Sequence, residues 1–231
     1  HCLINVADSK SSAKWVRDVT DRDDISVLDP IFPPPSTLSC KTHDLAICFI
    51  GRLAPVKNLE TVCNMVEKIA LFDLGFTFHI YGPDAGKKQQ VENWLSKHKH
   101  HASFPKLNLA YLGTLAPQKV QLVASRYHFI VSCSHTEGFA MSIAEAMQVG
   151  TVPIVGNVGG PATYCTPENA IILDDYSDVT LENVAKRVLA VWGHPAHYRS
   201  MSEAATQTFV SNQFFSFRYA NLLRHSVGLT M

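Results

Sequence analysis

The segment Leu45–Ala70 reads LAICFI-GRLAPVKN-LETVCNMVEKIA. Its apolar start, Leu45 to Ile50, predicts a buried strand, and Asn58 is the expected N-cap of a helix that follows. Helical spacing in that second part is carried by Leu59, Val62, Cys63, Val66, Ile69 and Ala70. A strand that leads through a short loop into a helix is the repeating unit of a doubly wound α/β sheet.

The loop between this strand and this helix carries two cations, Arg52 and Lys57. In open α/β sheets, ligands bind in a crevice outside the carboxyl ends of the strands. The loop that begins at Gly51 is therefore expected to face a ligand. Paired cations in such a loop suit an anionic group such as a diphosphate.

A second loop-to-helix segment, His135–Met147, reads HTEGFAMSIAEAM and places Glu137 and Glu145 eight positions apart. Gly138 is expected to adopt the backbone conformation of a sharp turn. A helix starting near Phe139 would then direct free N–H groups and its positive dipole end toward a phosphate. Carboxylates accept hydrogen bonds from hydroxyls. Together with the two cations, these residues predict a nucleotide-sugar site.

Strand-like runs occur from Leu45 to Ile50 and then end near Tyr81, Leu112, Cys133, Val155 and Leu173, with helices between them. They predict one doubly wound, Rossmann-like parallel sheet over residues 36–212. Upstream, residues 1–35 are expected to contain a strand at 2–6, a helix at 9–19 that includes Trp15 and Val16, and a strand at 25–28. A stiff Pro-rich linker would close that part, with Pro30, Pro33, Pro34 and Pro35.

The composition indicates a globular protein of the cytoplasm. The 231 residues include 20 basic and 20 acidic side chains, so no general attraction to nucleic acid is expected. No apolar stretch reaches the ~20 residues of a membrane span, and the first residues, His1 to Asn5, lack the basic and apolar regions expected of a signal peptide. Cys48, Cys63 and Cys133 lie in apolar runs and are expected to be buried thiols in a reducing compartment.

Taken in order, the motifs resemble the C-terminal, donor-binding domain of glycosyltransferase family 4, which has the two-domain GT-B fold. The resemblance covers about Leu45 to Leu223. It is carried by the G-R-L loop with Lys57, Gly82, Gly113, Ser132, the E-G-F turn at Glu137, the E-A-M helix at Glu145, Gly150, Pro153 and the Gly159–Gly160 pair.

The resemblance implies a role for each position. Arg52 and Lys57 would hold the donor diphosphate in place of a metal ion, and Glu137 would contact the donor sugar as the third catalytic residue. Glu145 would accept hydrogen bonds from the ribose. The other donor-binding positions would be Gly51, Gly138, Phe139 and Ala140. No cofactor, no metal and no enzyme nucleophile are implied, and the reaction would retain the anomeric configuration.

Two positions depart from the family pattern, because Ala140 and Asn58 stand where glycine is frequent. The methyl group of Ala140 is expected to narrow the sugar pocket. The donor is therefore left open between GDP-linked and UDP-linked sugars, and the acceptor among glycans, glycoproteins and glycolipids.

The resemblance also implies a division of the whole chain. Residues 1–35 would be a remnant of the N-terminal, acceptor-binding domain, through which peripheral attachment to a membrane is conceivable. Residues 213–231 would form a C-terminal helix that crosses back toward that domain. Phe214, Phe217 and Tyr219 would then expose apolar surface that favours self-association or a partner chain.

The leading interpretation is therefore a hexosyltransferase that moves a sugar from a nucleoside-diphosphate donor to an acceptor hydroxyl, with this chain alone expected to transfer poorly. Two alternatives stay open. One is a non-catalytic donor-binding module or subunit that works with a separate acceptor domain. The other is a GT-B-fold sugar-nucleotide epimerase or hydrolase.

Several further motifs are interpreted as structural. Asp21-Arg22-Asp23 follows a helix in a polar run and does not close an apolar strand, which argues against a D-x-D metal site. His98 ends a probable helix with His100 and His101, and no partner with zinc-ligand spacing accompanies them. His135 is expected to be a loop contact.

Overall fold

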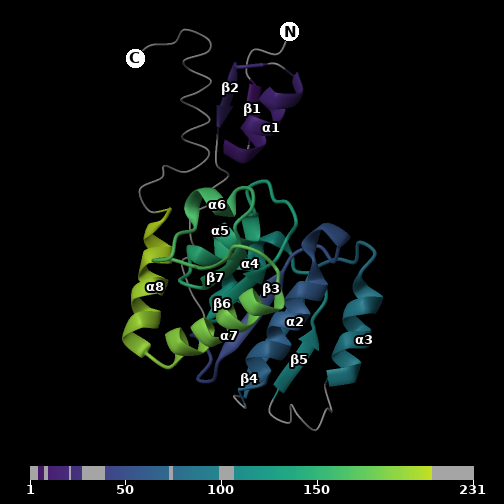
Figure 1. Cartoon of the computed structure of the whole chain (residues 1–231), viewed down its shortest axis with the longest axis vertical. Helices are drawn as coiled ribbons and strands as arrows, with labels where there is room; N and C mark the ends of the chain where they lie inside the picture. The colour runs from purple at the N-terminus through teal and green to yellow at the C-terminus, as the bar shows by residue number, and fades with distance from the viewer. Residues whose placement is uncertain are drawn as a thin grey trace.

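A parallel β-sheet forms the centre of the molecule in the computed structural model, which describes residues 5–7, 10–20, 22–27, 40–72, 75–98 and 107–209 (Figure 1). The sheet has six strands in the order β5-β4-β3-β6-β7-β8, and every neighbouring pair is parallel. The strands are β3 (Ala46–Ile50), β4 (Phe76–Tyr81), β5 (Leu107–Tyr111), β6 (Phe129–Ser132), β7 (Val152–Gly156) and β8 (Ile171–Leu173). The predicted doubly wound α/β fold is confirmed.

Helices cover both faces of this sheet (Figure 1). They are α2 (Leu59–Ala70), α3 (Lys88–His98), α4 (Val120–Ala124), α5 (Met141–Met147), α6 (Pro161–Tyr164), α7 (Asp178–Trp192) and α8 (Pro195–Gln207). Two short 3-10 helices, η1 (Pro55–Lys57) and η2 (Pro117–Lys119), precede α2 and α4.

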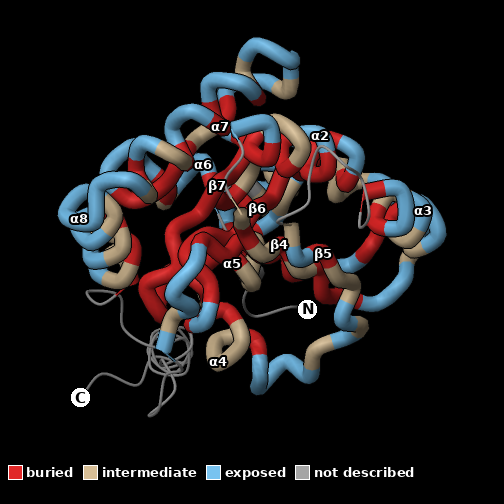
Figure 2. Tube along the Cα trace, turned by 90° about the horizontal axis from the view of Figure 1, so that it is seen from below, coloured by how far each residue is buried: buried red, intermediate tan, exposed pale blue. Residues whose placement is uncertain are grey.

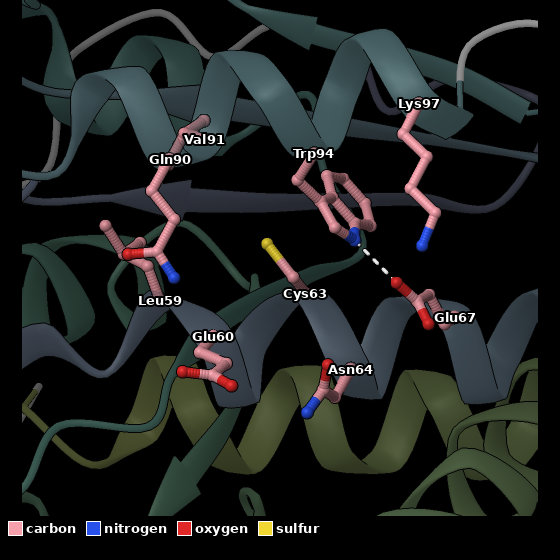
Figure 3. A pocket seen from close by; sticks show the side chains of 9 residues that line it. All are labelled: Leu59, Glu60, Cys63, Asn64, Glu67, Gln90, Val91, Trp94 and Lys97. Carbon is pink, nitrogen blue, oxygen red and sulfur yellow. Dashed lines mark hydrogen bonds between the residues drawn. The ribbon is translucent and has the colours of Figure 1, made fainter.

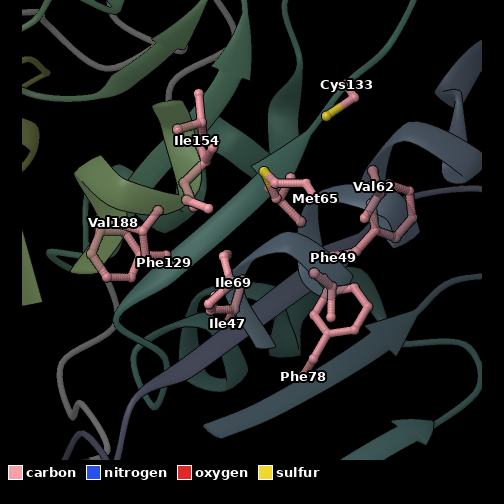
Figure 4. Packing of buried hydrophobic residues seen from close by; sticks show 14 of the residues in the cluster. Ile47, Phe49, Val62, Met65, Ile69, Phe78, Phe129, Cys133, Ile154 and Val188 are labelled. Atoms are coloured by element: carbon pink, nitrogen blue, oxygen red, sulfur yellow. The ribbon is translucent and has the colours of Figure 1, made fainter. Parts of the chain in front are cut away.

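Alternation of side chains along the strands divides the core into two layers. On β3, Ile47 and Phe49 pack with α2, α3 and α7 on one face, as the close view of that cluster shows (Figure 4). Ala46 and Cys48 point to the opposite face and pack with α4 and α5. All of β3 is buried, which explains why its sequence is a continuous apolar run. Buried residues accordingly follow the strands and the inner sides of the helices (Figure 2).

The N-terminal residues form a separate strand–helix–strand unit. Strands β1 (Asn5–Ala7) and β2 (Ile25–Val27) pair in parallel, and α1 (Lys10–Thr20) packs on them through a small cluster around Ala13. The three expected elements are thus present, with bounds that differ from the predicted ones by at most three residues. The predicted linker prolines and the C-terminal segment with Phe214, Phe217 and Tyr219 lie outside the described residues, and the proposed domain boundaries stay predictions.

One local expectation was wrong, and a second holds for the position of the residue. The helix after the E-G-F turn begins at Met141, two residues later than predicted, and the left-handed residue is Ala140 (φ 61°, ψ 65°), not Gly138. Asn58 is the N-cap residue of α2, as predicted, but its side chain makes no capping hydrogen bond. The reason is that Asn58 also ends η1 with a left-handed backbone (φ 48°), a conformation that asparagine tolerates better than most residues.

None of the helices that the structure describes has the length and apolar content needed to cross a membrane.

Candidate functional site

The two predicted site loops follow β3 and β6, which are adjacent in the sheet. Strands β4 and β5 extend from β3 to one side, whereas β7 and β8 extend from β6 to the other. The strand order therefore reverses between β3 and β6, and ligands of doubly wound proteins bind at this position. A backbone hydrogen bond joins the loops directly, since the His135 N–H donates to the Val56 carbonyl (2.9 Å).

An ion pair at this point unites two of the predicted residues. Lys57 Nζ lies 2.6 Å from Glu137 Oε1, and the two side chains are only 19% and 9% exposed. The same oxygen also accepts a hydrogen bond from Ser134 Oγ (2.6 Å) and a longer one from Ser132 Oγ (3.4 Å). A carboxylate that accepts several hydrogen bonds is held in one orientation.

The second oxygen of Glu137 has no such partners. Within the described part of the chain, no hydrogen bond or ion pair reaches Oε2 of Glu137. Every buried side-chain nitrogen or oxygen of the described residues does have a partner. Glu137 Oε2 therefore reaches solvent and is open to a donor such as a sugar hydroxyl.

Arg52 lies on the same loop as Lys57, but its side chain is exposed and forms no hydrogen bond or ion pair with any residue described. The loop itself is held by glycine contacts. Gly51 N–H donates to the Tyr81 carbonyl (3.0 Å), and Gly82 N–H donates to the Gly113 carbonyl (2.8 Å). Gly82 has φ 148°, and a Cβ there would overlap the Gly51 carbonyl. The close approach of the Gly51 carbonyl explains why a glycine follows β4 at position 82.

The E-G-F turn packs on the Gly159–Gly160 pair. Gly160 N–H donates to the Gly138 carbonyl (2.6 Å), and a Cβ at Gly159 (φ 59°) would overlap the Glu137 carbonyl. Both glycines are thus needed for close approach of two backbones.

The Phe139 side chain is buried in the core against Tyr164, whose hydroxyl donates to the Phe139 carbonyl (2.7 Å). The Phe139 side chain is therefore not available to a ligand. The N–H groups of Gly138, Phe139 and Ala140 make no hydrogen bond to a described residue. They are free to meet an anion or a sugar oxygen.

Glu145 is the fifth residue of α5 and is partly buried at the edge of the core, as its apolar neighbours indicate. It forms no hydrogen bond or ion pair with the residues that the structure describes. Burial raises the pKa of the Glu145 carboxyl from 4.5 to about 7. A carboxyl left without a protein partner is suited to accept hydrogen bonds from a ligand.

Tyr176 is the site residue that the sequence did not indicate. It lies in the loop between β8 and α7, and its hydroxyl donates to the Ser134 carbonyl (2.7 Å). Its ring covers Gly156, where a Cβ would overlap the tyrosine hydroxyl. His135 lies beside it with the ring centroids 6.2 Å apart, which agrees with the expected loop contact.

A separate hollow of about 310 Å³ lies between α2 and α3 (Figure 3). At one end, Glu67 Oε1 accepts a hydrogen bond from Trp94 Nε1 (2.6 Å) and lies 3.1 Å from His98 Nε2. His98 ends α3, as predicted, and is buried. Among the described residues, no group of three or more His, Cys, Asp or Glu side chains has a metal-binding arrangement. Asp21, His100 and His101 lie outside those residues.

Comparison with known proteins identifies the family of the chain. The family model described as "Glycosyl transferases group 1" matches residues 38–208. A glycogen synthase of Syntrophotalea carbinolica is 23% identical over 199 residues, which are 83% of this chain and 40% of that protein. The GtfA subunit of a UDP-N-acetylglucosamine–peptide N-acetylglucosaminyltransferase from Streptococcus agalactiae is 28% identical over 116 residues, which are 50% of this chain and 21% of that subunit.

Solved structures show the same fold at low sequence identity. A mutant of S. aureus TarM, in complex with Fondaparinux, alpha-GlcNAc-glycerol and UDP, superposes with a TM-score of 0.81 at 15% identity and covers 97% of this chain and 44% of its own. Anabaena HepE in complex with UDP and glucose gives a TM-score of 0.80 at 13% identity, and the match covers 99% of this chain and 64% of the HepE chain. The chain thus spans less than two thirds of these relatives. Because the family model matches most of its residues, the chain belongs to the glycosyl transferases group 1 family.

Proposed function

We propose that this chain is the donor-binding part of a retaining, family 4 glycosyltransferase that transfers a hexose from a nucleoside-diphosphate sugar to an acceptor hydroxyl. The observation that carries the proposal is the Lys57–Glu137 pair at the reversal of strand order, with Glu137 Oε2 open to a ligand. Lys57 and the exposed Arg52 bind the diphosphate, and Glu137 accepts hydrogen bonds from the sugar. Glu145 accepts hydrogen bonds from the ribose.

In this proposal, the two cations supply the charge that stabilises the leaving diphosphate. The free N–H groups of residues 138–140 add neutral donors at the same place. The leaving diphosphate assists the incoming hydroxyl on the same face of the sugar, so the anomeric configuration is retained and the protein needs no nucleophile. Binding then proceeds without a divalent metal.

The base and the sugar are proposed from the relatives. Both TarM and HepE are described in complex with UDP, so a UDP-linked sugar is the first donor to test and a GDP-linked sugar the second. Titration calorimetry with UDP and GDP, each with a chelator present, tests the proposal. We expect binding of at least one of them. Binding that requires added magnesium or manganese would contradict the metal-independent site.

Substitution of Lys57 tests whether this residue binds the diphosphate of the donor. Lys57→Ala should weaken diphosphate binding by about 1.5 to 3 kcal/mol, the usual range for a hydrogen bond to a charged group, and should leave uridine or guanosine binding unchanged. Lys186→Ala is the matched control, because Lys186 is exposed on α7 and has no partner among the described residues. Equal losses for nucleoside and diphosphate would show that Lys57 does not bind the phosphates.

A second candidate function is a donor-binding subunit that transfers sugar only with a separate acceptor-binding chain. The observation that favours it is coverage, because the chain spans 21% and 40% of the two curated relatives, and one of these is itself described as a subunit. Mass spectrometry of products, with and without an added acceptor-binding domain, distinguishes the two. Transfer by residues 1–231 alone supports the first function, whereas transfer only after addition supports the second.

A further inference from the structure

A chain of hydrogen bonds joins the loops after β3, β6 and β8 around one carboxylate. Tyr176 donates to the Ser134 carbonyl (2.7 Å), and the Ser134 hydroxyl donates to Glu137 Oε1 (2.6 Å). Glu137 Oε1 also accepts a hydrogen bond from Lys57 Nζ (2.6 Å). Tyr176 therefore lies two hydrogen bonds away from a residue assigned to the donor sugar, and three from the one assigned to the diphosphate.

The Tyr176 side chain packs closely on Gly156. Its hydroxyl and the adjacent ring atoms occupy space that a Cβ at residue 156 would fill, and the hydroxyl donates to the Ser134 carbonyl in the loop after β6. Burial, with a smaller effect of the nearby Cys133 and Glu137, raises the pKa of the Tyr176 hydroxyl to about 12. The hydroxyl stays protonated at neutral pH and remains a donor.

These hydrogen bonds fix the orientation of the Glu137 side chain. A glutamate side chain has several rotatable bonds, and fixing it costs conformational entropy when a ligand binds. Because Ser134 and Lys57 already occupy Oε1, the orientation that leaves Oε2 for a ligand exists before the ligand arrives. Preorganisation of this kind increases affinity without adding a contact.

We infer that Tyr176 is a positioning residue: by holding Ser134, it fixes the Glu137 carboxylate so that Oε1 stays with Lys57 and Oε2 is presented to a hydroxyl of the donor sugar. Tyr176 contributes to sugar recognition and has no direct role in diphosphate binding. The inference rests on the proposed function, because it takes Glu137 as the sugar-binding carboxylate.

The test compares a nucleotide with the matching nucleotide sugar. The affinities of UDP and UDP-glucose, and of GDP and GDP-mannose, are measured by calorimetry for wild type, Tyr176→Phe and Ser134→Ala. Phenylalanine keeps the ring over Gly156 and removes only the hydroxyl. Tyr198→Phe is the matched control, since Tyr198 also donates from a mostly buried site to backbone carbonyls, those of His128 (3.2 Å) and Gly150 (3.4 Å).

Tyr176→Phe should lower the ratio of nucleotide-sugar affinity to nucleotide affinity by roughly 3- to 10-fold, the range of one net hydrogen bond, and change nucleotide affinity less than about 2-fold. Ser134→Ala should lower the ratio by a similar factor. The double variant should lose no more than the larger single loss, because both act through one chain of contacts. Tyr198→Phe should leave the ratio unchanged.

An unchanged ratio in Tyr176→Phe would overturn the positioning role, as would an equal loss of nucleotide and nucleotide-sugar affinity or the same loss in Tyr198→Phe. If wild type binds neither nucleotides nor nucleotide sugars, the proposed function fails and this role fails with it. The two failures are distinguished by the wild-type titration alone.

Discussion

Glu145→Gln should make the folded protein more stable at pH 8 and leave its stability unchanged near pH 4.5. The carboxyl lies partly buried on α5 without a partner among the described residues, and burial raises its pKa from 4.5 to about 7. Between these two pH values, the unfolded chain has released the Glu145 proton and the folded chain still holds it. Stability therefore falls as the pH rises through this interval.

The size of the effect follows from the same numbers. At 1.36 kcal/mol per pKa unit, the difference between 4.5 and about 7 corresponds to roughly 3 kcal/mol above pH 7. Solvent reaches part of the side chain and screens the charge, so we expect a gain of about 1 to 2 kcal/mol for the neutral glutamine at pH 8.

The assay is urea unfolding at pH 5, 6, 7 and 8, followed by tryptophan fluorescence. Glu203→Gln is the control, because Glu203 is exposed on α8 without a described partner and should give no pH-dependent difference. A Glu145→Gln difference that stays constant with pH, or a variant less stable than wild type at pH 8, would refute the reasoning. Nucleoside binding gives a second measure, since a ligand that needs the ionised carboxylate should bind more weakly below pH 7.

Three further results are expected from the backbone around the site. Gly159→Ala should lower the free energy of unfolding by about 2 to 3 kcal/mol or more. Alanine would be strained in the left-handed backbone conformation at this position, and its Cβ would overlap the Glu137 carbonyl. At Gly113 (φ 76°) a Cβ would meet no atom within 4 Å, so Gly113→Ala should lower the free energy of unfolding only through backbone strain, by about 1 kcal/mol. Equal losses of stability in Gly113→Ala and Gly159→Ala would contradict the packing argument. Ala140→Gly should raise the unfolding free energy by about 0.5 kcal/mol, because relief of the left-handed strain exceeds the added entropy of the unfolded chain; a loss above about 1 kcal/mol would disprove it.

The sequence predicts the central strands well because β3, β6 and β7 are short runs that are buried along their whole length. β4 has the expected bounds, and β3 and β6 are shorter than expected by only one or two residues. The positions of Lys57 and Glu137 at the ends of neighbouring strands also follow from the motifs. Their direct ion pair does not, because it depends on how two loops far apart in the chain approach one another.

The conformation of the E-G-F turn is likewise decided by tertiary contacts. The sequence favours Gly138 for the tight turn, because glycine adopts a left-handed backbone without steric cost. In the structure Gly159 and Gly160 pack on the backbone at 137–138, and the left-handed residue is Ala140. The place of Tyr176 in the site could not be predicted from the sequence for a similar reason. Its contact with Ser134 joins residues 42 positions apart and has no local sequence signature.

The placement of β3 beside β6 has a consequence for folding. Lys57 and Glu137 are 80 positions apart, and β4, β5, α2 and α3 lie between them along the chain. Closing a loop of that length costs entropy before any contact rewards it, and folds with many such distant pairings form slowly. We therefore expect the pair to be completed late, once the two halves of the sheet have met. A ligand that binds there stabilises only the finished domain, so the number of ligand molecules bound per chain at saturation measures how much of a preparation is fully folded.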